Sequence, residues 1–189
     1  MQSRVIELKT DRLVLRMCEP DEASWVVAYL KANRRHLEDH SPSWAEDYIT
    51  VPFWEKQLAE NISEFQNDQT CRLFIFEKDE TDRVIGTANF TQIFRKAAQF
   101  CYLGYGLDQE KQGRGYMTEA LRAAIAFVFE EMNLHRIMAN YVPTNERSAS
   151  VLKKLGFQVE GYARDYLYLN GKWRDHILTS LTNKNWVDK

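Results

Sequence analysis

The residues best suited to chemistry form a glycine-rich turn, Gln112-Gly113-Arg114-Gly115, which precedes a segment with helical spacing. Amide N–H groups in the first turn of a helix lack intrahelical partners, and the helix dipole makes that end partly positive. Glycine lets the backbone approach an anion closely because it has no Cβ. The turn has neither the Gly-Lys-Ser/Thr of a P-loop nor the third glycine of a dinucleotide fingerprint. It therefore indicates a site for another phosphate-bearing ligand, or a helix start that binds nothing.

Two elements must hold this turn in place. A strand over residues 98–107 is expected before it, because apolar side chains recur at every second position: Cys101, Leu103, Tyr105 and Leu107. A helix is expected directly after it, because apolar side chains recur every three or four positions: Met117, Leu121, Ala124, Ile125, Val128 and Met132. The turn is thus predicted to connect a half-buried strand to an amphipathic helix.

The rest of the chain predicts further elements around this unit. Strands are expected over residues 12–16, 72–76, 84–94, 136–142, 157–169 and 173–181, and helices from residue 20, over 52–67 and over 146–155. A loop is expected over 34–51, and Asn170-Gly171 predicts a hairpin between the last two strands. The order β-α-α-β-β-β-α-β-α-β-β indicates an α+β fold, with a mixed, mostly antiparallel sheet flanked by helices. No linker or repeat divides the chain, so residues 1–189 are expected to form a single domain.

Composition and charge exclude several classes of function. The net charge of −2 argues against strong direct nucleic-acid binding, which usually needs a clustered excess of Lys and Arg. No metal is expected, because Cys18, Cys71 and Cys101 lack metal-ligand spacing and nothing completes a site around His36 and His40. The N-terminus lacks the apolar core of a signal peptide, and no apolar run is long enough to cross a membrane. These features predict a cytoplasmic protein with reduced thiols.

A set of motifs spread along the chain resembles the GNAT superfamily of acyl-CoA N-acyltransferases, and within it the RimJ/RimL branch. They are Thr10-Asp11-Arg12-Leu13-Val14-Leu15-Arg16, Leu103-Gly104-Tyr105-Gly106-Leu107, the stretch from Gln112 to Ala120, Leu134-His135-Arg136-Ile137, Asn145-Glu146-Arg147-Ser148, Leu155-Gly156-Phe157 with Glu160-Gly161, and Gly171-Lys172-Trp173-Arg174-Asp175-His176. No single motif is specific, but their order is. The segment from Leu134 to Leu181 is most similar to the alanine-specific members of that branch.

This resemblance implies that acetyl-CoA is the co-substrate. In the family, the turn and the first helical residues give backbone N–H groups to the pyrophosphate, in agreement with the dipole argument. The strand ending at Leu107 is expected to splay from the next one, so that backbone groups of Tyr105 and Leu107 pair with the pantetheine arm. Asn145 is expected to cap its helix and to orient the pantetheine. The expected cofactor contacts are Tyr105, Leu107, Gln112, Gly113, Arg114, Gly115, Tyr116, Met117, Thr118, Asn145 and Ser148.

The resemblance is weakest at the catalytic positions. Many relatives have a Tyr four residues before the Gly-Phe pair, which protonates the departing thiolate, but here that residue is Leu152. Ser148 is the expected substitute, with an ordinary helix-start residue as the alternative. RimL-type relatives place a Glu on the strand before the Asn-Gly turn, where this chain has Leu167. Asp165, two residues earlier, is the candidate base, with a structural carboxylate as the alternative and Glu160 in reserve.

The acceptor is predicted from the cost of deprotonating an amine. A protein α-amine has a pKa near 7.7–8.0, so its deprotonation at pH 7 costs only about 1–1.4 kcal/mol, against roughly 4.6 kcal/mol for a Lys side chain. The lack of an obvious base therefore favours an N-terminal amine, which would attack the thioester directly in a ternary complex, with a backbone N–H of the splayed strand stabilising the oxyanion. The expected partner is the N-terminal alanine of a small-subunit ribosomal protein. The alternatives are a small-molecule amine as acceptor, or a non-catalytic ribosome-assembly module. Trp44 either lines the acceptor groove or covers the core.

Overall fold

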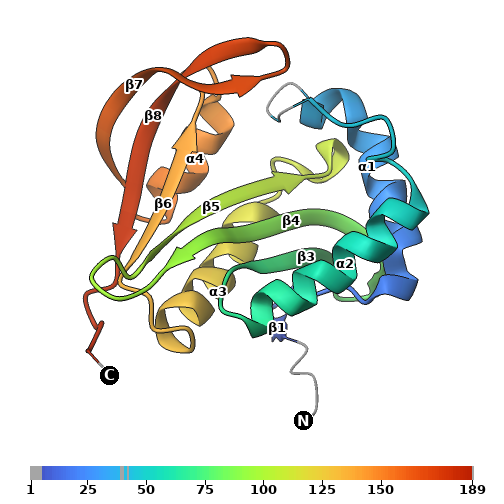
Figure 1. The fold of residues 1–189 in the computed structure, drawn as a ribbon, viewed down its shortest axis with the longest axis horizontal. Helices are drawn as coiled ribbons and strands as arrows, with labels where there is room; N and C mark the ends of the chain where they lie inside the picture. The colour runs from blue at the N-terminus through green and yellow to red at the C-terminus, as the bar shows by residue number, and fades with distance from the viewer. Residues whose placement is uncertain (1–5, 39–40, 42, 189) are drawn as a thin grey trace.

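The fold is built on one sheet, which the computed structural model defines together with its helices for residues 6–38, 41 and 43–188. The sheet has eight strands in the order β1-β2-β3-β4-β5-β6-β8-β7 (Figure 1). Neighbouring strands pair antiparallel except for β5 and β6, which are parallel. The strands are β1 (Glu7–Lys9), β2 (Leu13–Arg16), β3 (Cys71–Glu77), β4 (Glu80–Phe94), β5 (Phe100–Leu107), β6 (Arg136–Tyr141), β7 (Gln158–Leu169) and β8 (Lys172–Thr182). The predicted α+β class and mixed, mostly antiparallel sheet are confirmed.

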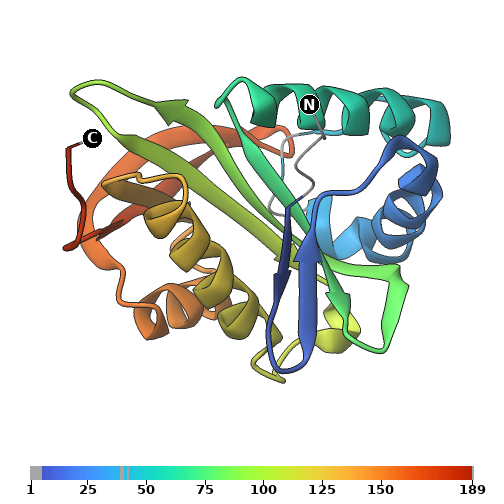
Figure 2. The ribbon, with the colours of Figure 1, turned by 90° about the horizontal axis from the view of Figure 1, so that it is seen from below.

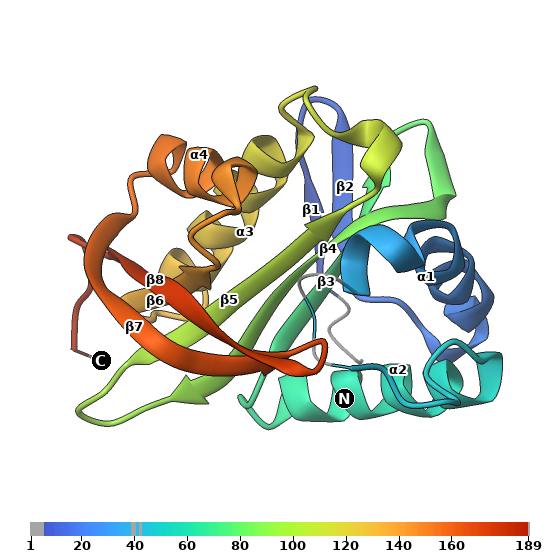
Figure 3. The same cartoon turned by 90° about the horizontal axis from the view of Figure 1, so that it is seen from above.

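Helices cover both faces of the sheet (Figures 2 and 3). On one face lie α1 (Ala23–Glu38) and α2 (Val51–Gln66), and on the other lie α3 (Tyr116–Glu130) and α4 (Glu146–Lys154). Alternation along β3 divides the core accordingly, because Phe74 packs with the residues of α1 and α2 whereas Leu73 and Ile75 pack with those of α3. Short 3₁₀ helices lie at Pro20–Glu22 and Gln109–Lys111.

Strands β5 and β6 pair over only part of their length. The ladder joins Phe100–Tyr102 to residues 136–138, after which β5 continues to Leu107 with no β6 partner (Figure 1). The Gly106 carbonyl points toward β4, since a Cβ on Gly86 would lie 2.7 Å from it. Backbone direction alternates along a strand, so the N–H and C=O groups of Tyr105 and Leu107 point into the gap beside β6. This is the splay that the resemblance implied.

The boundaries differ from the expectation at the start of the chain. The strand expected over residues 12–16 is β2, and an unexpected short strand, β1, precedes it in a hairpin where the Thr10 N–H donates to the Leu13 carbonyl at 2.9 Å. Helix α1 extends to Glu38, so the predicted loop starts later, and α2 begins at Val51, with the Thr50 hydroxyl accepting from the Phe53 N–H. Strand β4 begins at Glu80, four residues before the strand expected over residues 84–94. None of the helices in the described ranges is both long and apolar enough to span a membrane.

Candidate active site

A cavity of about 1030 Å³ lies along the gap between β5 and β6. Its lining includes residues of α1 and α2 from one face of the sheet and the N-terminal ends of α3 and α4 from the other. The β7–β8 hairpin adds Leu169 and His176. Of the residues predicted to contact the cofactor, all except Arg114 line this cavity. The gap in the sheet thus connects the glycine turn with the space beneath α1 and α2.

Two residues of the glycine turn adopt a left-handed backbone conformation, which glycine allows more readily than other residues. Gly113 has φ of +76° and Gly115, the N-cap of α3, has φ of +78°, both in the left-handed region. A Cβ on Gly113 would meet no atom within 4 Å, so this side of the turn is open. Tyr116, Met117 and Thr118, the first residues of α3, line the cavity. Their N–H groups precede that of Glu119, which donates to the Gly115 carbonyl at 3.0 Å and is the first intrahelical donor, so they have no acceptor within the helix. Donors and dipole together suit an anion.

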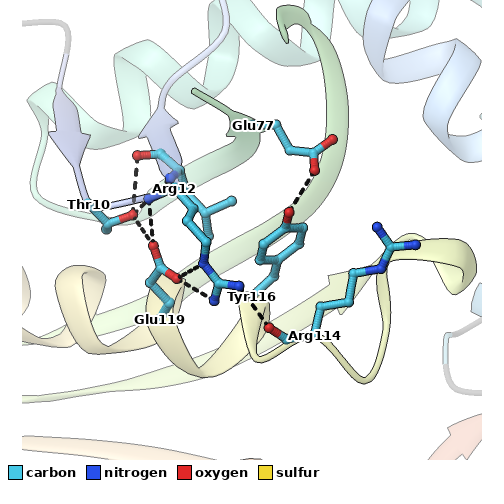
Figure 4. A network of polar contacts seen from close by, with 7 residues as sticks. Thr10, Arg12, Glu77, Arg114, Tyr116 and Glu119 are labelled. Atoms are coloured by element: carbon cyan, nitrogen blue, oxygen red, sulfur yellow. Dashed lines mark hydrogen bonds and ion pairs between the residues drawn. The ribbon is translucent and has the colours of Figure 1, made fainter. Parts of the chain in front are cut away.

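A network of ion pairs and hydrogen bonds connects the turn and the start of α3 to the β1–β2 hairpin (Figure 4). Glu119, in the first turn of α3, accepts from the Thr10 hydroxyl at 2.6 Å, from the Arg12 N–H at 2.9 Å and from Arg12 Nε at 2.7 Å. Burial opposes ionisation of Glu119, but these hydrogen bonds outweigh it and lower the pKa of the carboxyl. Arg12 Nη1 also donates to the Arg114 carbonyl at 3.0 Å. The β1–β2 hairpin is therefore fastened to the start of α3.

The Arg114 carbonyl contact sets the direction of one amide. In a trans peptide the C=O and the following N–H point in opposite directions, so fixing the Arg114 carbonyl toward Arg12 turns the Gly115 N–H the other way. The Arg12 guanidinium also lies 4.5 Å from the centre of the Tyr116 ring, and the Tyr116 hydroxyl donates to Glu77 at 2.8 Å (Figure 4). Glu77 is ion-paired with Lys111, whose hydrogen bond lowers the pKa of that carboxyl. Contacts from two neighbouring strands thus preorganise the turn.

The Ser148 side chain is hydrogen-bonded to a tyrosine in the lining of the cavity. The Asn145 side chain caps α4 by accepting from the Ser148 N–H at 3.0 Å. The Ser148 hydroxyl lies 2.7 Å from the Tyr105 hydroxyl. Burial raises the pKa of Tyr105 to about 12. The sequence pointed only to the backbone of Tyr105, although its alternation with Gly104 and Gly106 already placed the side chain on the α3–α4 face.

Asp165 and Glu160 do not line the cavity. Asp165 is the predicted base because a regular strand would put it on the same face as Leu167, but the β7–β8 register shifts between Ala163 and Leu167 and places residues 164–166 opposite Asp175. In this bulge Asp165 has φ of +46°, is exposed, and donates its N–H to Asp175 at 2.9 Å. Glu160 is ion-paired with Arg136 and accepts from Ser180 at 2.8 Å. The structure therefore separates both carboxylates from Ser148.

His176 is a cavity residue that the sequence reasoning missed as a chemical group. It is buried, and its Nδ1 lies 2.9 Å from the Arg174 carbonyl, to which it must donate because a carbonyl has no proton. A neutral His176 therefore keeps Nε2 as a proton acceptor. Its ring lies 5.5 Å from that of Tyr166, whose hydroxyl accepts from Asn140 at 3.3 Å. Its position in the final motif, after Trp173-Arg174-Asp175, was the available signal.

The space beneath α1 and α2 has aromatic walls and few charges. Trp44 lines the cavity, with its ring 5.0 Å from Tyr48, which in turn lies 5.5 Å from Trp54. Among the described residues of the lining, the only carboxylate is Glu146, which belongs to α4. Arg72 is the nearest fixed charge in this part and is ion-paired with Glu64 at 3.5 Å. Such a surface suits a neutral amine or a peptide better than a polycation.

The described residues hold no cluster of His, Cys, Asp and Glu fit to bind a metal ion, and His40 lies outside them. The cysteines Cys18, Cys71 and Cys101 are free and buried, and burial raises the pKa of each. None of them lines the cavity, so no thiol is placed to act as a nucleophile there.

Known proteins match this architecture over nearly the whole chain. A family model described as "Acetyltransferase (GNAT) domain" matches residues 12–158. The ribosomal protein uS5-alanine N-acetyltransferase of Escherichia coli (strain K12) is 42% identical over 96% of this chain and 93% of its own length. The crystal structure of the ribosomal-protein-S5-alanine acetyltransferase from Vibrio fischeri is similar with a TM-score of 0.92 and 35% identity, over 97% of this chain and 100% of that one. Mycobacterium smegmatis RimJ, solved with CoA-disulfide, has a TM-score of 0.86 and 26% identity over 98% and 90% of the two chains.

Proposed function

We propose that this chain, which belongs to the GNAT family of acetyltransferases, transfers the acetyl group of acetyl-CoA to the N-terminal α-amine of a protein. The proposed acceptor is the N-terminal alanine of a small-subunit ribosomal protein, which would place the reaction in the cytoplasm. The observation that carries the proposal is a continuous cavity, which joins the glycine turn to an aromatic-walled space free of carboxylates. The similarity to the Escherichia coli enzyme supports the choice of acceptor.

The residues of the cavity fit the parts of acetyl-CoA. The amides of Gly113 to Thr118 would hold its pyrophosphate, and the backbone groups of Tyr105 and Leu107 would pair with its pantetheine arm. Asn145 fixes the start of α4, which brings Ser148 to the cavity beside Tyr105. Acetyl-CoA supplies an acetyl group activated as a thioester, so the protein needs only to orient it, handle protons and stabilise charge.

The hydroxyl pair acts on the leaving sulfur. As the N–C bond forms and the C–S bond breaks, negative charge develops on sulfur, and the Ser148 hydroxyl is the proposed donor toward it, supported by Tyr105 at 2.7 Å. A thiol titrates near pH 8.5, so complete transfer of a proton from Tyr105, with its pKa of about 12, would cost roughly 5 kcal/mol. Hydrogen bonding to the thiolate is therefore the effect that dominates, and the proton arrives from solvent afterwards.

His176 is the proposed acceptor of the amine proton. Its Nδ1 donates to the Arg174 carbonyl, which leaves Nε2 for a substrate on the face of the sheet that α1 and α2 cover. Only a weak base is needed, since deprotonating a protein α-amine at pH 7 costs about 1–1.4 kcal/mol. A Lys acceptor at roughly 4.6 kcal/mol would need more help than one neutral imidazole supplies.

Mass spectrometry of peptides tests the acceptor directly. A peptide that begins with alanine and also contains an internal lysine is incubated with the protein and acetyl-CoA, beside the same peptide with its α-amine blocked. We expect one acetyl group on the α-amine of the first peptide and none on the second. Acetylation of the lysine in the blocked peptide, or of spermidine in preference to both peptides, would refute the proposed acceptor.

A further inference from the structure

The hydroxyl of Tyr29 is buried without a protein partner. Tyr29 lies on α1 and is 5% exposed, and its Oη forms no hydrogen bond with any described residue. Arg72 Nε is the other side-chain atom in this state among the described residues, and Arg72 still has its ion pair with Glu64. Burying an unpaired hydroxyl opposes folding, because the group gives up water and gains nothing in return. Tyr29 lines the cavity, so a ligand in the cavity can supply the missing bond.

The hydroxyl lies over the unpaired end of β5. A Cβ on Gly106 would lie 3.2 Å from Tyr29 Oη and 3.2 Å from a methyl group of Leu37. Gly106 stands between Tyr105 and Leu107, the residues whose backbone groups point into the gap. The Tyr29 hydroxyl therefore reaches the middle of the stretch that pairs with the pantetheine arm, and the missing side chain at residue 106 keeps this approach open.

Helix α1 is fixed against that end of β5. Asn33 donates its side-chain amide to the Tyr29 carbonyl at 3.1 Å and accepts from the Gln109 N–H at 2.9 Å. Gln109 begins the short helix that directly follows β5 and leads into the glycine turn. The position of Tyr29 is thus set by the same backbone that positions the pantetheine and the pyrophosphate.

We infer that the Tyr29 hydroxyl donates a hydrogen bond to an amide carbonyl of the pantetheine arm. A carbonyl accepts and does not donate, so the phenol supplies the proton. The inference rests on the binding of coenzyme A in the proposed function, and not on which amine is acetylated. It makes α1 a second wall of the pantetheine channel, opposite the backbone of β5.

Tyr29→Phe tests the inference, because it removes one oxygen and keeps the ring. Isothermal titration calorimetry is done with coenzyme A and with 3′-phospho-ADP, which shares the nucleotide but lacks the pantetheine arm. We expect the variant to bind coenzyme A about two- to tenfold more weakly, as for the loss of one hydrogen bond, and to bind 3′-phospho-ADP like the wild type. Without ligand, its melting temperature should equal or exceed that of the wild type, since the unpaired hydroxyl is gone.

The matched control is Tyr168→Phe, which removes a hydroxyl from a 55% exposed tyrosine outside the cavity lining and should change neither affinity. Three results would overturn the inference: unchanged coenzyme A affinity in Tyr29→Phe, an equal loss for both ligands, or a lower melting temperature without ligand. A raised KM for the acceptor peptide with unchanged coenzyme A affinity would assign the hydroxyl to the acceptor instead. Wild-type protein that binds coenzyme A but acetylates no peptide would refute the proposed function and leave this inference intact.

Discussion

Replacing Arg12 with lysine separates two effects of this side chain on the glycine turn. Lysine keeps the positive charge beside Glu119. It lacks the planar fork with which Arg12 reaches Glu119 through Nε and the Arg114 carbonyl through Nη1 at the same time. If charge alone matters, the lysine variant should bind coenzyme A like the wild type. If the direction of the Gly115 N–H matters, it should bind more weakly.

The structure favours the second effect. The side chains of Arg12 and Glu119 are 48% and 19% exposed, so solvent screens the ion pair, which contributes only about 0.2–1 kcal/mol. A hydrogen bond from an amide to a charged oxygen is worth about 1.5–3 kcal/mol. Loss of one such bond through a misdirected Gly115 N–H predicts coenzyme A binding about 10- to 150-fold weaker in Arg12→Lys. Arg12→Ala should bind more weakly still, because it also leaves the Glu119 carboxylate uncompensated near the anion site.

Calorimetry with coenzyme A and thermal unfolding, each at low and at high salt, measure these effects. Arg34→Lys is the matched control, since Arg34 donates to Glu38 at 2.7 Å on the exposed side of α1. If Arg12→Lys lowers the melting temperature but binds coenzyme A with wild-type affinity, Arg12 only stabilises the fold and the argument from peptide direction fails. If the loss in the lysine variant disappears at high salt, charge and not direction is responsible.

Three further predictions concern the proton-handling groups and the ion pairs. Ser148→Ala should lower kcat about 10- to 100-fold because it removes a hydrogen bond to the developing thiolate, while calorimetry shows a coenzyme A affinity within about twofold of wild type. Tyr105→Phe should lower kcat about two- to tenfold. Unchanged turnover in Ser148→Ala would remove Ser148 from the mechanism. His176→Gln should lower kcat about tenfold or more near neutral pH, and the loss should shrink as pH rises because more of the acceptor amine is already deprotonated; a pH-independent loss would contradict a role as base. The pKa of Glu119 is lower in the folded protein than the ordinary value of 4.5, so the unfolded state takes up a proton first as the pH falls. This contribution to stability is therefore complete above pH 4.5 and is lost as pH falls below it. Urea unfolding of Glu119→Gln should therefore show a shallower loss of stability on acidification than the wild type, and parallel curves would refute the shift.

Local sequence patterns predicted strand β5, the glycine turn and helix α3, because the hydrophobic spacing of a strand or a helix depends only on neighbouring residues. The alternation from Cys101 to Leu107 and the three-to-four spacing after Met117 follow from burial of one face of a strand and one stripe of a helix. The same reasoning failed at Asp165, where a bulge breaks the period of two. Most side chains of β7 are exposed or half-buried, so the alternation that could have revealed the bulge is weak in this strand.

The contacts that complete the site depend on distant parts of the chain. Glu119 meets Arg12 across 107 positions, and Tyr105 meets Ser148 across 43. Such pairs depend on how β2, β5 and α4 are arranged in space, and no propensity or spacing rule encodes that arrangement. The position of His176 also depends on a distant segment, because the pairing of β8 with β6 brings this part of the chain to the cavity. The resemblance supplied the motifs that contain these residues, and the three-dimensional structure supplied their partners.

The alternation of glycine with larger residues along β5 explains how one strand serves two sides of the reaction. Leu103, Tyr105 and Leu107 face α3 and α4, where Tyr105 meets Ser148 at the proposed leaving-group side. Gly106 faces α1, and a Cβ at this position would lie 3.2 Å from both Leu37 and the Tyr29 hydroxyl, a tight contact. The proposed hydrogen bond to the leaving sulfur and the proposed entry of the amine therefore lie on opposite faces of the sheet. A substitution at Gly106 should therefore obstruct the α1 side while leaving the Tyr105–Ser148 pair in place.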